Sequence, residues 1–291
     1  MPKHILIVIL LCGVFKPLAV YCQQNIYLPT YFTAYYQNLS QITPGHVSEE
    51  GKAEFASSYK SLTGAFRKIS SYNFSASRTF RNEKERAHVV RMQFFNEHEG
   101  SYITNPRVYL NYAYQIPLSE TLKAFSGISF GTAGVYYSAP TTTQSSFFLP
   151  DAWFGLGLKS NWFEIGTSAM QLFNGSFTPV ANPVLMKRYY HAYGSIQKEW
   201  PSEWMIKGYL LGRFVPSIDT EYFGAFSISY AKQVTLGTSI KYGAGLSFFT
   251  MLGIDNKEDK LQLLLNYNSP FFSLIPAYQS NIEIGLAYVL Q

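Results

Sequence analysis

The sequence has few charged residues for its length and no apolar run long enough to cross a membrane as a helix. Lys, Arg, Asp and Glu make up only 14% of the 291 residues, whereas a typical soluble domain contains about 25%. The mean hydropathy is nevertheless -0.03, so the apolar residues are interleaved with polar ones. This combination is typical of a transmembrane β-barrel, in which apolar and polar side chains alternate along each strand.

Cysteine is almost absent, and both cysteines, Cys12 and Cys22, lie in a segment that has the pattern of a secretory signal peptide. A short polar start is followed by an apolar run over 5–15, which is too short for a spanning helix. We expect cleavage after Cys22, with a lipidated Cys22 as the alternative. The mature chain would then have no thiol and no disulfide. The formal net charge of +5 without a basic cluster argues against binding of nucleic acid.

Two-residue alternation of apolar and polar residues recurs along the rest of the chain. In the last segment, for example, Ile282, Ile284 and Leu286 alternate with Asn281 and Glu283. Successive side chains of a strand point to opposite faces, so such a strand can face lipid on one side and a polar lumen on the other. The pattern predicts an all-β, antiparallel, outer-membrane barrel of about fourteen strands. The predicted strands are 52–61, 70–80, 87–97, 102–116, 122–136, 151–159, 161–171, 186–199, 203–214, 221–231, 233–243, 244–254, 259–269 and 279–291.

The predicted connections differ in length between the two ends of the barrel. An even number of strands places both chain ends on the periplasmic side, and bacterial barrels keep their longer loops on the outer side. The longer gaps follow the first, fifth, seventh and thirteenth predicted strands, as this rule requires. Residues 23–51 are rich in Tyr, Gln and Asn and predict a periplasmic or lumen-inserted segment. The predicted domains are a signal peptide over 1–22, this segment over 23–51 and the barrel over 52–291.

Aromatic residues gather near the ends of the predicted strands. Rings with a polar edge settle at the lipid–water boundary, so we predict that these residues form aromatic girdles. Packing of aromatic rings inside a soluble β-sandwich is the alternative. The residues concerned are Phe147, Phe148, Trp153, Trp162, Trp200, Trp204, Phe271 and Phe272.

Candidate catalytic and metal-binding residues are few. His191 and Ser195 would share one face of a strand, but their spacing separates them by roughly 13 Å, too far for a nucleophile and its base. Residues 97–99 (Glu-His-Glu) fall in a predicted solvated connection without further metal ligands nearby. The acidic residues of 255–259 lack the spacing of a calcium loop and predict a turn. We therefore predict a non-enzymatic protein without a metal or a cofactor.

Three sequence blocks carry a resemblance to a known family. NYAYQIPL at 111–118 is followed by SGISFGTAGVYY at 126–137. PDAWFGLGLKSNWFEIGTSAMQLFN occupies 150–174, and KRYYHAYGSIQKEW at 187–200 precedes VPSID at 215–219. The order and spacing of these blocks resemble those of the PorP/SprF family of outer-membrane proteins, which belong to the type IX secretion system of Bacteroidetes. The front of the chain, at 27–45, and the final Gln291 depart from the family pattern.

The resemblance implies a non-catalytic barrel in the bacterial outer membrane that docks periplasmic secretion-ring components or anchors secreted adhesins with a C-terminal sorting domain. Block positions that would contact such partners are Asp151, Phe154, Asn174, Arg188, Tyr189, Tyr190 and Asp219. For Asp151 and Asp219 the alternative is a role in starting turns.

A diffusion channel or small-solute transporter is the alternative function. Fourteen strands can enclose either an open lumen or a plug. A channel would prefer anions if its inner face carried the four cations Arg107, Lys207, Arg213 and Lys241. A lumen packed by the side chains of Tyr189, His191 and Tyr193 would argue against a channel.

Overall fold

The computed structural model describes most of the chain after residue 25. The described residues are 26–29, 32, 34–48, 51–82, 85–138, 145–178, 183–216, 218–243, 245–256, 259–270 and 280–291. The predicted signal peptide, 1–22, lies outside them. Within these ranges no helix has both the length and the apolar character needed to cross a membrane.

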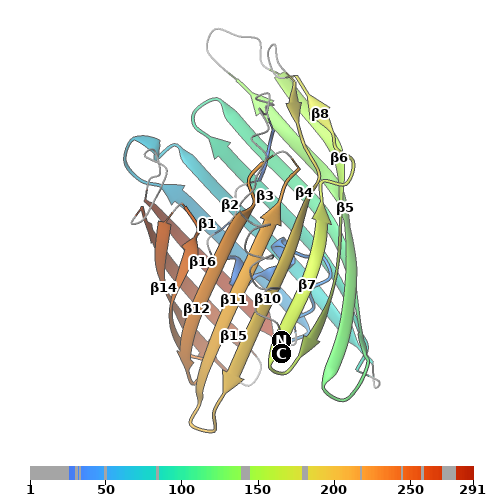
Figure 1. Cartoon of the computed structure of the whole chain (residues 1–291), viewed down its shortest axis with the longest axis vertical. Helices are drawn as coiled ribbons and strands as arrows, with labels where there is room; N and C mark the ends of the chain where they lie inside the picture. Colours follow the sequence, from blue (N-terminus) through green and yellow to red (C-terminus); the bar gives the residue numbers. More distant parts are fainter. Residues whose placement is uncertain are drawn as a thin grey trace, which may run out of the picture.

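Fourteen antiparallel strands close into one barrel, because the first strand pairs with the last one (Figure 1). The predicted all-β barrel and its number of strands are thus confirmed. Closure lets neighbouring strands satisfy each other's backbone groups, as lipid requires. The barrel strands are β1 (Ala53–Leu62), β2 (Ile69–Arg81), β3 (Ala87–Glu99), β4 (Ile103–Pro117), β5 (Leu122–Tyr137), β6 (Ser145–Ser160), β7 (Phe163–Met170), β10 (Tyr189–Glu199), β11 (Trp204–Phe214), β12 (Glu221–Tyr230), β13 (Val234–Lys241), β14 (Gly245–Asp255), β15 (Asp259–Ser269) and β16 (Asn281–Leu290).

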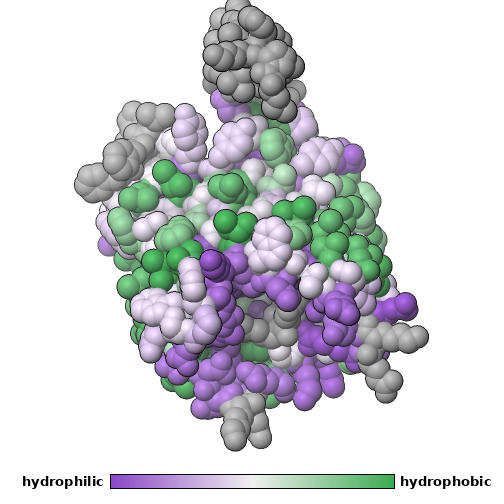
Figure 2. Space-filling view, turned by 60° about the horizontal axis from the view of Figure 1, so that its bottom comes forward, coloured by the Kyte–Doolittle hydropathy of each residue, from purple (hydrophilic) through white to green (hydrophobic). Residues whose placement is uncertain are grey.

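The outer wall of the barrel is apolar and the inner wall is polar. In β16 the side chains of Ile282, Ile284 and Leu286 are exposed, whereas Asn281 and Glu283 are buried. The same alternation holds along β4 and β15, as the sequence predicts. On the face shown in Figure 2, hydrophobic residues form a band across the wall, and hydrophilic residues gather at the lower end. Such a band is what the hydrocarbon core of a membrane covers.

The two ends of the barrel carry connections of different length. One end, here called the terminal end, holds the C-terminus and the short connections 82–86, 118–121, 161–162, 200–203, 231–233 and 256–258. The opposite end, here called the loop end, holds 63–68, 100–102, 138–144, 171–188, 215–220, 242–244 and 270–280. The loop end is at the top of Figure 1. The predicted placement of the long connections after odd-numbered strands agrees with this structure.

Three predictions about the wall are wrong. β6 begins at Ser145 and not at 151, because its first half pairs with β5 alone, and an edge strand tolerates Pro150. Trp153 is buried inside the barrel and is no girdle residue, whereas Phe148, Trp162 and Trp204 are exposed as predicted. Glu97 belongs to β3 and is 3% exposed, so it does not lie in a solvated connection. Phe271 and Phe272 fall outside the described residues.

The connection 171–188 contains a small hairpin that the sequence does not reveal. It consists of β8 (Ser176–Phe177) and β9 (Val184–Leu185), which form a separate two-stranded sheet. Ile26 forms a parallel bridge with Leu185, and the Tyr27 backbone N–H donates to the Leu185 carbonyl. The hairpin therefore holds the first described residues of the chain at the loop end.

The chain then runs through the lumen from the loop end to the terminal end. Residues 34–48, here called the lumen segment, contain two short 3-10 helices, η1 (Tyr35–Gln37) and η2 (Leu39–Gln41). Most of these residues are buried. At the terminal end the Lys52 backbone N–H donates to the Leu290 carbonyl, and β1 begins. The lumen segment therefore occupies the barrel that the following strands build around it.

Candidate docking site at the loop end

The lumen segment packs against the inner wall through aromatic and aliphatic side chains. The Tyr36 ring lies 4.7 Å from the Phe249 ring and 5.4 Å from the Tyr209 ring, centroid to centroid. Leu39 and Ile42 belong to the same buried cluster. Burial of this apolar area favours the inserted position of the segment, since the gain is roughly 25 cal/mol per Å² removed from water.

Two wall glycines make room for the lumen segment at its closest approach. A Cβ atom on Gly127 would lie 2.5 Å from the Pro44 carbonyl oxygen, and one on Gly155 would lie 2.2 Å from the Thr43 hydroxyl. Real Cβ atoms do not approach other atoms so closely, so both positions require glycine, which has no side chain. The residues of the wall are therefore complementary in size to the lumen segment at this contact.

His191 holds the lumen segment through buried hydrogen bonds. Its Nδ1 lies 3.0 Å from the Ile42 carbonyl oxygen and 3.1 Å from the Ser168 hydroxyl, which itself donates to the Ile42 carbonyl. All of these atoms are buried. Among the described residues no group of three His, Cys, Asp or Glu is placed to bind a metal.

A buried ion pair lies in the lumen toward the loop end. Arg107 donates to Glu97 at 2.8 Å, and the Tyr27 hydroxyl donates to the other oxygen of the same carboxylate at 2.8 Å. Burial, together with the charge of Glu97, raises the pKa of Tyr27 well above its usual value, so the phenol keeps its proton and remains a donor. These contacts fasten the start of the chain to β3 and β4.

Three of the four inner-face cations considered from the sequence are paired with carboxylates, two of them with the same one. Arg107 is paired with Glu97, and both Arg213 and Lys241 are paired with Glu221. Each pair offsets the positive charge inside the lumen. Tyr189, His191 and Tyr193 are all buried, which is the packing that argues against a channel.

Asp151 organises a buried hydrogen-bond network and cannot reach a partner. Its Oδ2 accepts from the Tyr109 hydroxyl at 2.8 Å and from the Trp153 indole N–H at 2.9 Å, while Oδ1 accepts from the Ala152 N–H at 2.8 Å. Tyr109 and Trp153 stack with centroids 3.9 Å apart. Asp151 therefore does not start a turn, because it lies within β6.

Asn174 and Arg188 join the two ends of the connection 171–188. The Asn174 side-chain oxygen accepts from the Arg188 backbone N–H at 2.6 Å, and the Arg188 guanidinium donates to the Leu172 carbonyl at 2.5 Å. Asn174 has a φ of 50°, a left-handed conformation that asparagine tolerates better than most residues. The Leu172 N–H also donates to the Ala152 carbonyl. We call this arrangement the loop clamp.

The remaining predicted site residues are distributed over the outer wall, the lumen and the loop end. Phe154 and Tyr190 are 42% exposed on the outer wall, where they face lipid. Tyr189 is buried in the lumen, with its ring 5.3 Å from the His191 ring. Asp219 is exposed at the loop end. The structure thus joins Asn174 and Arg188 by a hydrogen bond, whereas Tyr189 and Tyr190, which follow Arg188, are buried in the lumen and exposed on the outer wall, respectively.

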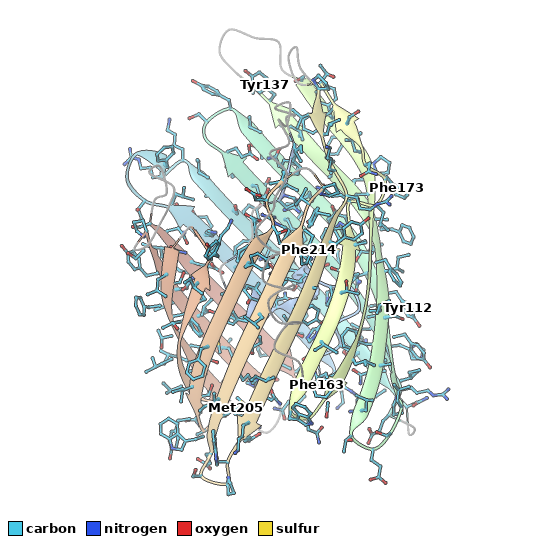
Figure 3. The ribbon with its side chains drawn as sticks, in the orientation of Figure 1. Tyr112, Tyr137, Phe163, Phe173, Met205 and Phe214 are labelled. Atoms are coloured by element: carbon cyan, nitrogen blue, oxygen red, sulfur yellow. The ribbon has the colours of Figure 1, made fainter. Side chains whose placement is uncertain are left out.

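A cavity of about 310 Å³ opens beside the loop clamp at the loop end. Its walls come from residues 26–28, from the end of β3, from the loop-end parts of β4 and β5 and from the β8–β9 hairpin. Figure 3 places Tyr137, one of its lining residues, at this end, and shows Phe173 on the outer wall. The second cavity, deeper in the lumen, measures only about 20 Å³, which is room for about one water molecule.

Sequence reasoning missed Tyr109, Glu97 and the cavity. Strand parity could have placed the Tyr109 side chain inside, because Tyr109 lies two residues from Arg107, which was considered as an inner-face residue. The cavity left no such signal, since its walls come from segments that are far apart in sequence.

Comparisons with known proteins agree on the architecture and give one family. Residues 25–288 match the family described as type IX secretion system membrane protein PorP/SprF. Comparison with curated proteins finds no match. The toluene transporter TodX of Pseudomonas putida has a TM-score of 0.53 at 8% identity, over 86% of this chain and 93% of that one. A TodX deltaS2S3 mutant, a monoaromatic hydrocarbon channel, has a TM-score of 0.51 at 7% identity, over 83% and 90%. At such identities the likeness shows the fold alone.

Proposed function

This chain belongs to the PorP/SprF family of type IX secretion system membrane proteins and lies in the outer membrane, and we propose that it acts there as a docking barrel. The loop end faces the cell exterior and holds a secreted adhesin that carries a C-terminal sorting domain. The terminal end faces the periplasm and contacts components of the secretion ring. The barrel itself performs no chemistry.

The filled lumen is the observation that carries this proposal. Residues 34–48 occupy the space that a diffusing solute would need, and the cavity beside Arg107, Trp153 and Tyr189 in the lumen measures only about 20 Å³. The glycines at 127 and 155 and the contacts of His191 fit the wall to this segment. A barrel closed in this way offers two rims for protein contact and no conduit.

The loop clamp supports a docking role for the loop end in particular. It joins the two ends of a long connection by hydrogen bonds to backbone atoms, and a preorganised surface loses less entropy when a partner binds. The cavity of about 310 Å³ beside it is of a size found in binding sites.

A hydrocarbon channel is the second candidate function, since that cavity opens toward the exterior and is mostly apolar. It would require the lumen segment to move aside. The two candidates differ in a measurable way, because a channel conducts solute without a partner protein.

Affinity purification of the C-terminally tagged protein from its native outer membrane, followed by mass spectrometry, tests the proposal. We expect a large surface adhesin, ring components or both to be recovered with the wild-type barrel. Arg188→Ala opens the loop clamp and should release the adhesin alone. Lys232→Ala disrupts the exposed Lys232–Glu199 ion pair at the terminal end and should leave the adhesin bound. A solitary barrel that conducts ions in planar bilayers would contradict the docking role.

A further inference from the structure

The cavity at the loop end combines apolar walls with one acidic group at its rim. Apart from Tyr27 and Tyr137, its polar lining is Glu99 and Asn105; the apolar lining residues are Ile26, Leu28, Ile103, Val135, Phe177 and Val184. The Asn105 side chain donates to Glu99 Oε1 at 2.7 Å. No Lys or Arg belongs to the described lining.

The nearby carboxylate of Glu97 differs from that of Glu99 in its exposure and its partners. Glu97 is 3% exposed and is satisfied by Arg107 and Tyr27. Glu99, by contrast, is exposed at the end of β3. The cavity therefore presents a single accessible negative charge beside an apolar interior.

The size of the cavity restricts its occupant. About 310 Å³ is at the lower end of the range for ligand pockets and accepts one large side chain with part of its backbone, but no folded element. Because the cavity opens at the loop end and closes below, the occupant enters from the side on which the proposed partner docks.

We propose that this cavity receives one large apolar side chain of the docked polypeptide, while an adjacent basic residue of that polypeptide pairs with Glu99. This inference rests on the proposed docking function and names the recognition chemistry of the same site. The apolar side chain supplies contact area, and the carboxylate selects its neighbour by charge.

Three capped dipeptides serve as probes of the purified full-length barrel in nanodiscs. Acetyl-Phe-Lys-amide contains both elements, acetyl-Phe-Glu-amide reverses the charge, and acetyl-Ser-Lys-amide lacks the apolar group. We expect the first to bind more tightly than either of the others by about tenfold or more. Equal binding of the three dipeptides, or no binding at all, would overturn the proposal.

Two variants locate the binding. Val135→Phe fills the cavity and should abolish binding of acetyl-Phe-Lys-amide, whereas Val90→Phe, at a 50% exposed position on the outer wall, should leave it unchanged. If Val135→Phe fails to give a folded barrel on a heat-modifiability gel, Val184→Phe, from the opposite wall, replaces it. Glu99→Gln should remove the preference for Lys over Glu, and Glu203→Gln at the terminal end should keep it. Binding that survives the cavity-filling variant would place the probe elsewhere and end the proposal.

The same variants separate this inference from the docking function itself. A Val135→Phe barrel that still recovers the adhesin from native membranes would refute the cavity and leave docking intact. A wild-type barrel that recovers no partner would refute docking.

Discussion

Asp151 concentrates three hydrogen bonds on one buried carboxylate, and its removal should destabilise the barrel. Asp151→Ala leaves the Tyr109 hydroxyl and the Trp153 N–H without their acceptor, at a cost of ~1–3 kcal/mol for each buried donor. Asp151→Asn keeps an acceptor for those two donors and loses the one for Ala152, so its effect should be smaller. We expect the free energy of unfolding to decrease in the order wild type, Asp151→Asn, Asp151→Ala. Unfolding in urea, monitored by tryptophan fluorescence in detergent, measures this order.

An exposed aspartate provides the control for this series. Asp255 is the exposed last residue of β14 at the terminal end, and Asp255→Asn should change the free energy of unfolding by no more than ~0.5 kcal/mol. An Asp151→Ala barrel as stable as the wild type would show that the network contributes nothing.

Asn174 combines a left-handed backbone with a hydrogen bond, and two substitutions separate these properties. Asn174→Gly keeps the backbone conformation at little cost and removes the acceptor for the Arg188 N–H. Asn174→Ala loses the acceptor and also strains the backbone. We expect trypsin to cleave after Lys187 faster in the glycine variant than in the wild type, and fastest in the alanine variant. Equal cleavage of the two variants would mean that the backbone conformation contributes no stability.

At the scale of elements, the fit between the lumen segment and the wall predicts how the lumen can be opened. In Gly127→Ala the new methyl group would meet the Pro44 carbonyl at 2.5 Å, so the lumen segment must shift. We expect ion conductance in planar bilayers to rise above that of the wild type, whose lumen is filled. The expected increase in conductance is small, because one methyl group displaces only part of the lumen segment.

Gly194→Ala is the matched control, because its Cβ would lie 3.7 Å from the nearest atom, on Ile165, an ordinary van der Waals contact. It should conduct like the wild type. If both alanine variants conduct equally, the conductance does not come from the lumen segment.

The elements of the wall could be predicted from the sequence because lipid imposes one rule on every strand. Apolar and polar side chains must alternate along a strand that lies between lipid and a polar lumen. This alternation predicts β15 and β16 from their sequences. The first half of β6 was missed since Pro150 is typical of a loop, and the β8–β9 hairpin was missed because two-residue strands carry no period.

The inside of the barrel was harder to predict for a physical reason. Trp153 was assigned to a girdle on residue type alone, although its position two residues after Asp151 places the two side chains on the same face. The lumen segment has no strand period, so its contacts with His191 and Gly127 depend on tertiary structure. The motif residues Asn174 and Arg188 were identified from the resemblance, but their joint role as a clamp needed the geometry.

For the whole molecule, the course of the chain through the lumen joins the two faces of the membrane. Ile26 lies at the loop end beside β9, and Lys52 lies at the terminal end beside Leu290. A closed barrel cannot be threaded easily after assembly, so we expect the lumen segment to enter before β1 pairs with β16.

Single cysteines test this orientation, because a mature chain cleaved after Cys22 has no other thiol. A membrane-impermeant maleimide applied to intact cells should label Ile26→Cys at the exterior and leave Lys52→Cys unlabelled. After the outer membrane is permeabilised, Lys52→Cys should be labelled as well, since Lys52 is exposed at the terminal end. The wild type reports the background. If Lys52→Cys alone is labelled on intact cells, the barrel has the opposite orientation. The loop clamp and its cavity then lie in the periplasm, where they face the secretion ring and no surface adhesin.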